Sequence, residues 1–349
     1  MKSAFKAIGI VLGLLIVLVG LTMTIFVSHS GLLTDRGPEQ TTACSAIDGQ
    51  GKSAEDILID RERGLALVSW RDRRTQSLGT IGRIDLNAPQ PKIESALAAD
   101  PPEFKPHGMS LFIGPEGQRT LFVISHPAGK PHRVEVFEAN ANGLYEHKQT
   151  IEDPLLIRPN DLAAVGSRQF YVANDSGAKN GLDGMRETVF GAALAQVTYY
   201  DGAKFSVAVD DVASPGGIAV SADLATIYLA ETQGKRILAF KRDVASGALT
   251  QTGSALLPSL PDNIDVAADG ALWVVAHANA IAMIQQFADP AKVAPTQVFR
   301  IPADTMTARQ VFFTTGSVIS TGSVAATLDD KMLLGSITDK KVMLCQRPE

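Results

Sequence analysis

The segment "MSLFIGPEGQRTLFVIS", Met109–Ser125, shows the pattern on which this chain is built. Two short apolar runs flank a turn that contains glycine and proline, which predicts two β-strands joined tightly. Similar strand–turn–strand segments recur along the chain, as "DILIDRERGLALVS" from Asp56, "DLAAVGSRQFYVAN" from Asp161, "GIAVSADLATIYLAE" from Gly217, "NIDVAADGALWVVAH" from Asn263 and "SVAATLDDKMLLGS" from Ser323. The sequence therefore predicts an all-β protein made of repeats.

These repeats are spaced almost evenly. Their turns fall at positions 60, 114, 166, 221, 268 and 328, so the successive steps are 54, 52, 55, 47 and 60 residues. A period of about 50 residues with this content is typical of β-propeller blades, each of which buries its faces against its neighbours. We expect residues 31–349 to form a single six-bladed β-propeller. A pair of β-sandwiches or an irregular all-β domain is the alternative.

The N-terminal segment 1–30 differs from the rest of the chain. Residues 7–27 carry no charge and are rich in Leu, Val and Ile, and Lys2 and Lys6 precede them. As a helix, this span is about 31 Å long, close to the thickness of a bilayer core. We expect an uncleaved signal anchor, with both lysines cytoplasmic and the body outside the cytoplasm, periplasmic or extracellular. A cleaved signal peptide that yields a secreted form is the alternative, although no Ala-x-Ala site follows.

Composition excludes several classes of function. Lys+Arg number 32 and Asp+Glu 37, a net charge of -5, which argues against nucleic acid as a partner. The chain has neither a Gly-x-Ser-x-Gly nor a His-Glu-x-x-His motif.

Of its two cysteines, Cys44 precedes the first repeat and Cys345 lies in the last strand of the sixth. A closing ring brings these ends together, so we expect a disulfide in the exported body; two free thiols are the alternative.

Acids, amides and a histidine stand at one equivalent point of several repeats, immediately before the first strand. They are Glu55-Asp56, His107, Asn160-Asp161 and Asp262-Asn263. In a propeller, equivalent points of the blades face the same end of the central channel, so these side chains should converge. A ring of carboxylate and amide oxygens suits a hard cation such as calcium. Capping of turns before strands is the alternative for any single pair.

The other histidines differ in their surroundings. His126 follows His107 one strand later, at the end of that strand, and His277 ends the equivalent strand of the fifth repeat. His132 and His147 fall in polar loop sequence, where we expect solvated side chains.

These motifs, in this order, resemble the paraoxonase/arylesterase family, whose members are calcium-dependent lactonases built on a six-bladed propeller. The resemblance covers essentially the whole exported chain. It rests on Glu55-Asp56, "PHGMS" from Pro106, "SHP" from Ser125, "NDLAAVGSRQFYVAND" from Asn160, "GIAVSADLATIYLAE" from Gly217, "DNIDV" from Asp262 and the terminal cysteines.

The resemblance implies a role for each matched residue. The ligands implied for a catalytic calcium are Glu55, Asn160, Asp262 and Asn263. Those implied for a second, structural calcium are Asp56, Asp161 and the backbone carbonyl of Met109. His107 and His126 match a proton-transfer dyad, and Asp175 and His277 match further active-site positions.

One position departs from the family pattern. The family has an asparagine ligand just before the "GI" of the fourth repeat, where this chain has Gly216. The resemblance implies calcium-dependent hydrolysis of a small lactone or aryl ester by water that a histidine activates. Two alternatives stay open, a gluconolactonase-type hydrolase with fewer metal ligands and a membrane-tethered propeller that binds a partner without catalysis.

Overall fold

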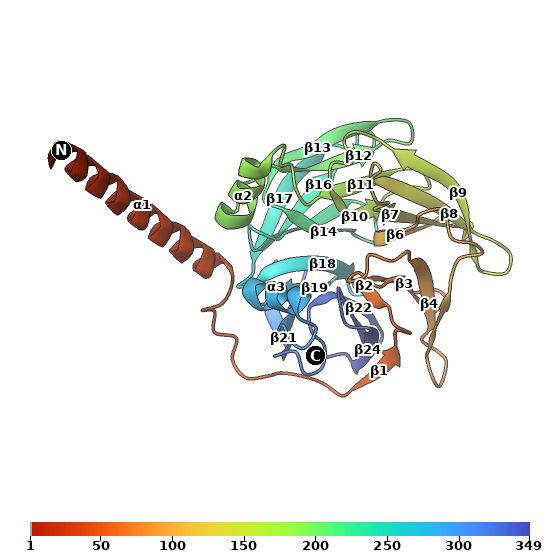
Figure 1. Cartoon of the computed structure of the whole chain (residues 1–349). Helices are drawn as coiled ribbons and strands as arrows, with labels where there is room; N and C mark the ends of the chain where they lie inside the picture. The colour runs from red at the N-terminus through yellow and green to blue at the C-terminus, as the bar shows by residue number, and fades with distance from the viewer. Residues whose placement is uncertain (1) are drawn as a thin grey trace.

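The computed structural model describes residues 2–349, except for the side chains of residues 2–4 and 7; the expectation for the Lys2 side chain therefore lies outside it. The strands form six four-stranded antiparallel sheets (Figure 1). Blade one contains β2 (Ser53–Asp60), β3 (Leu65–Arg71), β4 (Thr80–Asp85) and β5 (Ile93–Ser95). Blade two contains β6 (Pro106–Ile113), β7 (Arg119–Ser125), β8 (Arg133–Ala139) and β9 (Tyr145–Glu152). Blade three contains β10 (Pro159–Ala164), β11 (Phe170–Asn174), β12 (Ala195–Tyr200) and β13 (Phe205–Val212). Blade four contains β14 (Pro215–Val220), β15 (Thr226–Glu231), β16 (Arg236–Arg242) and β17 (Leu249–Leu256). Blade five contains β18 (Leu260–Val266), β19 (Leu272–His277), β20 (Thr296–Ile301) and β21 (Arg309–Thr314). Blade six contains β22 (Gly322–Leu328), β23 (Lys331–Ser336), β24 (Lys341–Gln346) and β1 (Cys44–Asp48).

The six sheets close into a ring, which confirms the predicted six-bladed propeller. The first strand of each blade contacts the first strand of the next, in the order β2, β6, β10, β14, β18, β22 and back to β2. Apolar side chains fill the space between neighbouring blades, so each core is shared by two blades. Between the last blade and the first, for example, Val324 and Leu333 pack with Ala54, Ile57 and Trp70. This sharing explains why a single blade could not bury its own faces.

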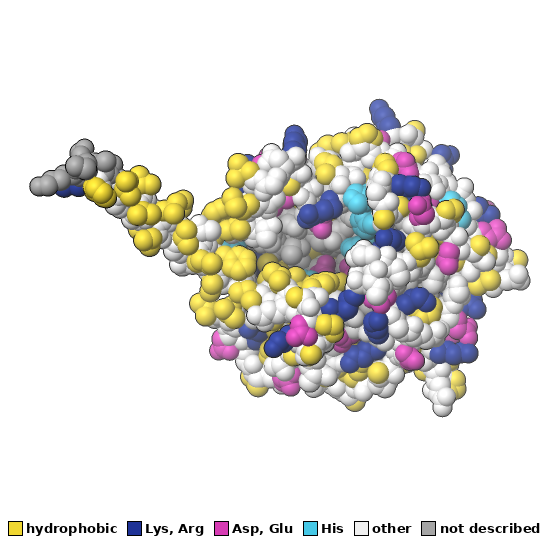
Figure 2. All heavy atoms as spheres, in the orientation of Figure 1, with side chains coloured by type: hydrophobic (Ala, Val, Ile, Leu, Met, Phe, Trp, Pro, Cys, Tyr) yellow, Lys and Arg dark blue, Asp and Glu magenta, His cyan; other side chains and the backbone are white. Residues whose placement is uncertain are grey.

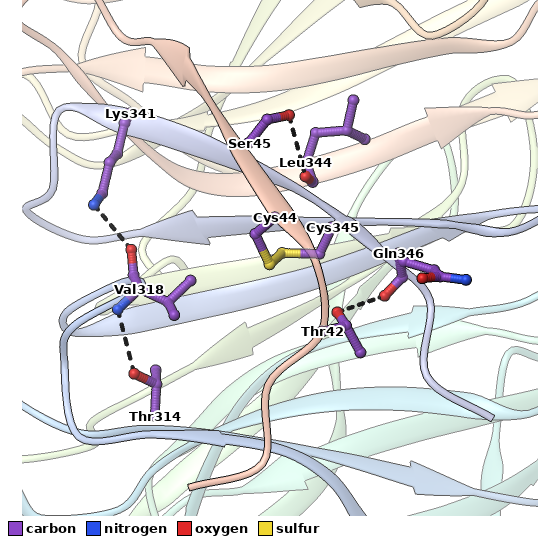
Figure 3. The surroundings of a disulfide bond; sticks show 9 residues. All are labelled: Thr42, Cys44, Ser45, Thr314, Val318, Lys341, Leu344, Cys345 and Gln346. Carbon is purple, nitrogen blue, oxygen red and sulfur yellow. Dashed lines mark hydrogen bonds between the residues drawn. A yellow bond between two sulfur atoms is a disulfide. The ribbon is translucent and has the colours of Figure 1, made fainter.

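The ring is closed by the N-terminal strand. β1 is the outer strand of the sixth blade and pairs with β24, so strands from both ends of the propeller share one sheet. Cys44 lies directly opposite Cys345 in this pairing and is bonded to it, at a sequence separation of 301 (Figure 3). The predicted disulfide is therefore confirmed. Thr42, just before β1, adds a hydrogen bond from its hydroxyl to the carbonyl of Gln346 over 2.7 Å.

Within residues 2–349, three helices accompany the propeller. α1 (Lys2–His29) projects away from the body (Figure 1), and within it Ile8–His29 has a mean hydropathy of 2.9 and is long enough to span a membrane. α2 (Gly181–Phe190) connects β11 to β12, and α3 (Ala280–Ala288) connects β19 to β20. The Ala280 N–H donates to the carbonyl of Ser30 over 2.8 Å, which fixes the base of α1 against the fifth blade.

Candidate active site

All the predicted ring residues except Asp161, which pairs with Ala173 directly after a bulge, lie in β-bulges. In every blade, the pairing between the first two strands shifts so that extra residues of the first strand have no partner. A bulge re-aims side chains that would otherwise face the blade cores. The bulged residues are Glu55 and Asp56, His107 and Gly108, Asn160, Gly216 and Gly217, Asp262 and Asn263, and Ser323. We expected these residues immediately before the first strand; the structure places them inside it.

Four carboxylates of this ring are buried together, those of Glu55, Asp56, Asp161 and Asp262. Backbone amides hold two of them in place, because Met109 N–H donates to Asp56 Oδ2 over 2.7 Å and Ile218 N–H to Asp161 Oδ2 over 2.8 Å. Burial raises the pKa of both aspartates well above the usual range, and repulsion between the neighbouring carboxylates adds to this. A cation would relieve this repulsion.

Two amide oxygens of the ring have no partner. Within the described residues, no donor reaches the buried Oδ1 atoms of Asn160 and Asn263. Their Nδ2 groups point elsewhere, to Asp175 Oδ2 over 3.3 Å and to the carbonyl of Glu55 over 3.2 Å. Since an amide NH₂ can only donate, these bonds fix each oxygen on the opposite side. A buried acceptor without a donor is costly, and a cation is the partner it lacks.

These oxygens fit calcium better than they fit a metal that prefers histidine and thiolate. No three histidine, cysteine, aspartate or glutamate side chains in residues 2–349 come together as a metal site of their own. A cation here must therefore draw on the asparagine oxygens as well. Mixed carboxylate and amide oxygen sets are the usual ligands of calcium.

Gly216 faces this ring, as the sequence pattern implied. A Cβ atom built on it would lie 3.2 Å from Asp262 Oδ1 and 2.8 Å from Thr232 Oγ1. The Thr232 hydroxyl donates to the carbonyl of Pro261 over 2.7 Å. The fourth blade thus contributes no side-chain oxygen from this bulge, and a threonine hydroxyl occupies the space beside it.

Three histidines lie in a row at the edge of the ring. The rings of His107 and His126 meet edge to face with centroids 5.0 Å apart, and His126 Nδ1 lies 2.8 Å from His132 Nδ1. His107 Nδ1 lies 2.9 Å from the carbonyl oxygen of Asn160. Because a carbonyl only accepts, Nδ1 carries the proton and Nε2 is the basic nitrogen. Burial lowers the pKa of His107 and His126 well below the ordinary histidine value, so both are neutral at pH 7.

The expectation of a solvated loop residue was wrong for His132, whereas His147 is exposed as expected but lies in a strand and not in a loop. His132 is half-buried against His126, and His147 lies in β9 with its Nε2 2.7 Å from Glu135 Oε2. The sequence around His132, "PAGKPHRVE", gives no sign of this contact, because it depends on how the loop between β7 and β8 folds back.

Asp175 and His277 also reach the ring residues. His277 Nε2 lies 2.9 Å from Asp262 Oδ2, and Asp175 accepts from Asn160 and from Arg158. The pairing of Pro159 with Asn174 and of Leu260 with His277 puts the ends of β11 and β19 at the same end of the propeller as the bulges. The structure thus brings together all the site residues that the sequence singled out.

Basic residues were not among the candidates, yet Arg73 lies in the site. It belongs to the β3–β4 connection, and its Nη2 donates to Glu55 Oε2 over 3.2 Å and to the Pro106 carbonyl over 3.1 Å. Figure 2 shows a hollow on this face, with histidine side chains on its wall and acidic side chains at its floor. A separate cavity of about 420 Å³ opens beyond Asp56 and Asp161, toward Arg61 at the other end of the channel.

Known proteins match this chain over most of its length. The Arylesterase family model matches residues 59–346. Serum paraoxonase/arylesterase 2 of Gallus gallus is 30% identical over 310 residues, which cover 84% of this chain and 86% of the relative. Serum paraoxonase/arylesterase 1 of Homo sapiens is 28% identical, over 93% of this chain and 96% of the relative.

Solved structures share the fold at low sequence identity. A gluconolactonase from Xanthomonas campestris superposes with a TM-score of 0.56 at 16% identity, over 90% of this chain and 96% of its own. Regucalcin from Agrobacterium tumefaciens, described as a calcium-binding protein, gives 0.55 at 12% identity, over 88% and 94%. At these identities the likeness shows the propeller fold alone.

Proposed function

This chain belongs to the arylesterase family and is a hydrolase of ester bonds, and we propose that it hydrolyses lactones and aryl esters with calcium as its cofactor. The observation that carries the calcium proposal is the pair of unpartnered oxygens, Asn160 Oδ1 and Asn263 Oδ1, buried among carboxylates. Neutral oxygens placed beside negative ones have no use for another hydrogen-bond acceptor, whereas a hard cation binds both.

Two ions fit the charge of the ring. The proposed ligands of the catalytic ion are Glu55, Asn160, Asp262 and Asn263. The proposed ligands of the structural ion are Asp56, Asp161 and the Met109 carbonyl. Two calcium ions carry as much positive charge as the four buried carboxylates carry negative charge, and Arg73 adds one positive charge beside Glu55. Bound at the mouth, calcium supplies Lewis-acid polarisation of the scissile carbonyl and stabilises the negative charge that develops on its oxygen.

His107 is the proposed general base. Its Nδ1–H is held by the Asn160 carbonyl, so its Nε2 is free to take a proton from water. The lowered pKa keeps this nitrogen unprotonated at neutral pH. His126 packs against His107 and contacts His132, so it can accept the proton and pass it toward the outer histidine. A histidine pair of this kind separates the proton from the cation.

Asp175 and His277 are proposed as residues that position the ligands. Asp175 holds the Asn160 amide so that Oδ1 faces the ring, and His277 holds one oxygen of Asp262. Removing either contact would let a ligand rotate away without removing the ligand itself.

We place the enzyme at a membrane, with its propeller outside the cytoplasm. The disulfide favours an exported location. α2 contacts α1, and α3 begins at Ala280, which is bonded to Ser30 at the base of α1; both helices expose apolar side chains, such as Leu182, Met185 and Ile284. A secreted form would follow if α1 were cleaved as a signal sequence.

The experiment that tests the proposal measures calcium and turnover together. The full-length protein in detergent should contain calcium, hydrolyse γ- or δ-lactones and phenyl acetate, lose activity in a chelator and regain it with calcium. Asn160→Ala should lose both bound calcium and activity. His107→Gln should lose turnover but keep its calcium, and the exposed Asn142→Ala should change neither. Absence of turnover with saturating calcium would refute the proposal.

Of the alternatives, a non-catalytic propeller is disfavoured, because the chain belongs to an ester-hydrolase family. A gluconolactonase-type hydrolase is favoured by one observation, the missing ligand at Gly216. Comparing the turnover of glucono-δ-lactone with that of phenyl acetate separates the two, since the gluconolactonase alternative predicts that only the sugar lactone is hydrolysed.

A further inference from the structure

Two arginines from one connection enter the candidate site. Arg71 is the last residue of β3, opposite Ser53 at the end of the blade where the bulges lie, and Arg73 follows in the β3–β4 connection. Arg71 is only 4% exposed, and the Arg73 side chain only 8%. Arginine is rarely buried to this extent unless its charge is paired.

The donors of these arginines are only partly used. Arg73 gives one nitrogen to Glu55 and Pro106, but its Nε has no acceptor among residues 2–349. Arg71 makes a single contact, from Nη2 to the neutral Gln76 Oε1 over 3.3 Å, and no acceptor in the described chain reaches its Nε or Nη1. Several buried N–H donors therefore lack a partner, and leaving them so is costly.

Arg73 pairs with Glu55, but within residues 2–349 no carboxylate forms a salt bridge with Arg71. Asp72, between the two arginines, turns away to Lys340 Nζ at 2.9 Å. Glu55, the acid that Arg73 contacts, is also a proposed ligand of calcium. Arg73 lies close to the proposed general base, because it donates to the carbonyl of Pro106, the residue before His107, and to Glu55 Oε2, which is 3.6 Å from His107 Nδ1.

We propose that Arg71 and Arg73 form a binding subsite for an oxyanion, so that the preferred substrates are lactones or esters that carry a carboxylate or phosphate group. Guanidinium groups bind both anions through paired N–H···O bonds. The subsite lies beside the histidines, so the anion would sit next to the ester while the carbonyl meets the calcium ring. The preference for charged substrates rests on the proposed function, because it assumes ester hydrolysis. The binding of an anion by the two arginines does not depend on that reaction.

The first test compares two substrates that differ in one charge. The probes are a γ-lactone with a ring carboxylate and its methyl ester, assayed with saturating calcium. Wild-type protein should prefer the carboxylate form in kcat/KM. In Arg71→Gln this preference should fall about 10- to 100-fold, mainly through KM, because a charge-assisted pair is lost. Arg71→Lys should fall in between, and the exposed Arg168→Gln should keep the wild-type preference.

The second test needs no turnover. Binding of acetate and of inorganic phosphate is measured by calorimetry on the full-length protein, and the two titrations tell which oxyanion the subsite takes. Wild type and Arg168→Gln should bind at least one of them, and Arg71→Gln should not. The inference is overturned if Arg71→Gln loses kcat/KM equally on both lactones. It is also overturned if the wild-type protein shows no preference for the charged lactone and binds neither anion. Anion binding without hydrolysis of any lactone would count against the proposed reaction and for the subsite.

Discussion

Removing the Cys44–Cys345 bond should destabilise the propeller by an amount that follows from its position. The bond joins residues 301 positions apart, so it closes almost the whole propeller into one loop. In the chain-entropy model, opening a loop of this length lowers the free energy of unfolding by about 6 kcal/mol at 25 °C. Roughly 300 residues unfold with the propeller, at about 2 cal/mol/K each, so the melting temperature should fall by about 10 °C.

The variant is Cys44→Ala/Cys345→Ala, melted by calorimetry as full-length protein in detergent beside the oxidised and the reduced wild type. Cys345 is buried in the core between the fifth and sixth blades, so alanine also removes some packing. Reduced wild type loses the cross-link alone. The difference between it and the double variant therefore measures the packing, and the shift common to both measures the cross-link. Ser45→Ala, in the same strand, is the control and should melt like wild type.

A double variant that melts within about 2 °C of the oxidised wild type would refute this reasoning. In that case the β1–β24 pairing, with the Thr42 hydroxyl, would hold the ring closed without the disulfide.

Three further predictions concern the site and the anchor. The first variant combines Gly216→Asn with Thr232→Ala, which removes the hydroxyl that the new Cβ would meet at 2.8 Å. In a calcium titration it should bind calcium about tenfold more tightly than Thr232→Ala alone. Equal affinities would show that position 216 does not reach the ion. Because burial, and next to it Arg73, lowers the pKa of His107, the acid limb of kcat/KM should lie below pH 6.5, and Arg73→Gln should move it to higher pH; an unmoved limb would assign it to another group. Leu15→Asp/Leu18→Asp should weaken membrane insertion by about 6–8 kcal/mol and move the protein to the soluble fraction on alkaline extraction, whereas a wild-type protein already soluble there would indicate cleavage of α1.

The number of blades could be predicted from the sequence because it depends on local patterns. Each segment such as Met109–Ser125 carries its own two strands and turn, and six evenly spaced segments leave few other ways to bury their faces. The disulfide followed from the same ring, since closure brings the terminal strands together. Neither conclusion required knowing how any side chain is oriented.

Features that depend on orientation could not be predicted in the same way. The bulges that turn the ring residues into the channel leave no mark in hydrophobic alternation, so Glu55 and Asn160 were placed outside their strands. His132 reaches His126 only through the fold of a loop, and a polar loop sequence reads as solvent-exposed whatever it contacts. Arg71 ends an apolar strand in a charged run, "RDRR", a pattern usual for a surface turn, although its side chain is buried.

The bulges also separate the chemistry of this protein from its architecture. Residues that skip the pairing of the first two strands do not contribute to the ladder of hydrogen bonds, and they do not fill the cores between blades. Position 216 is an example: a glycine there leaves no side-chain oxygen in the channel, while the strands of its blade still pair with one another. Four blades have two such residues and two blades have one, and none of them pairs with the neighbouring strand. A propeller of this kind can acquire a new substrate by changing one blade at a time.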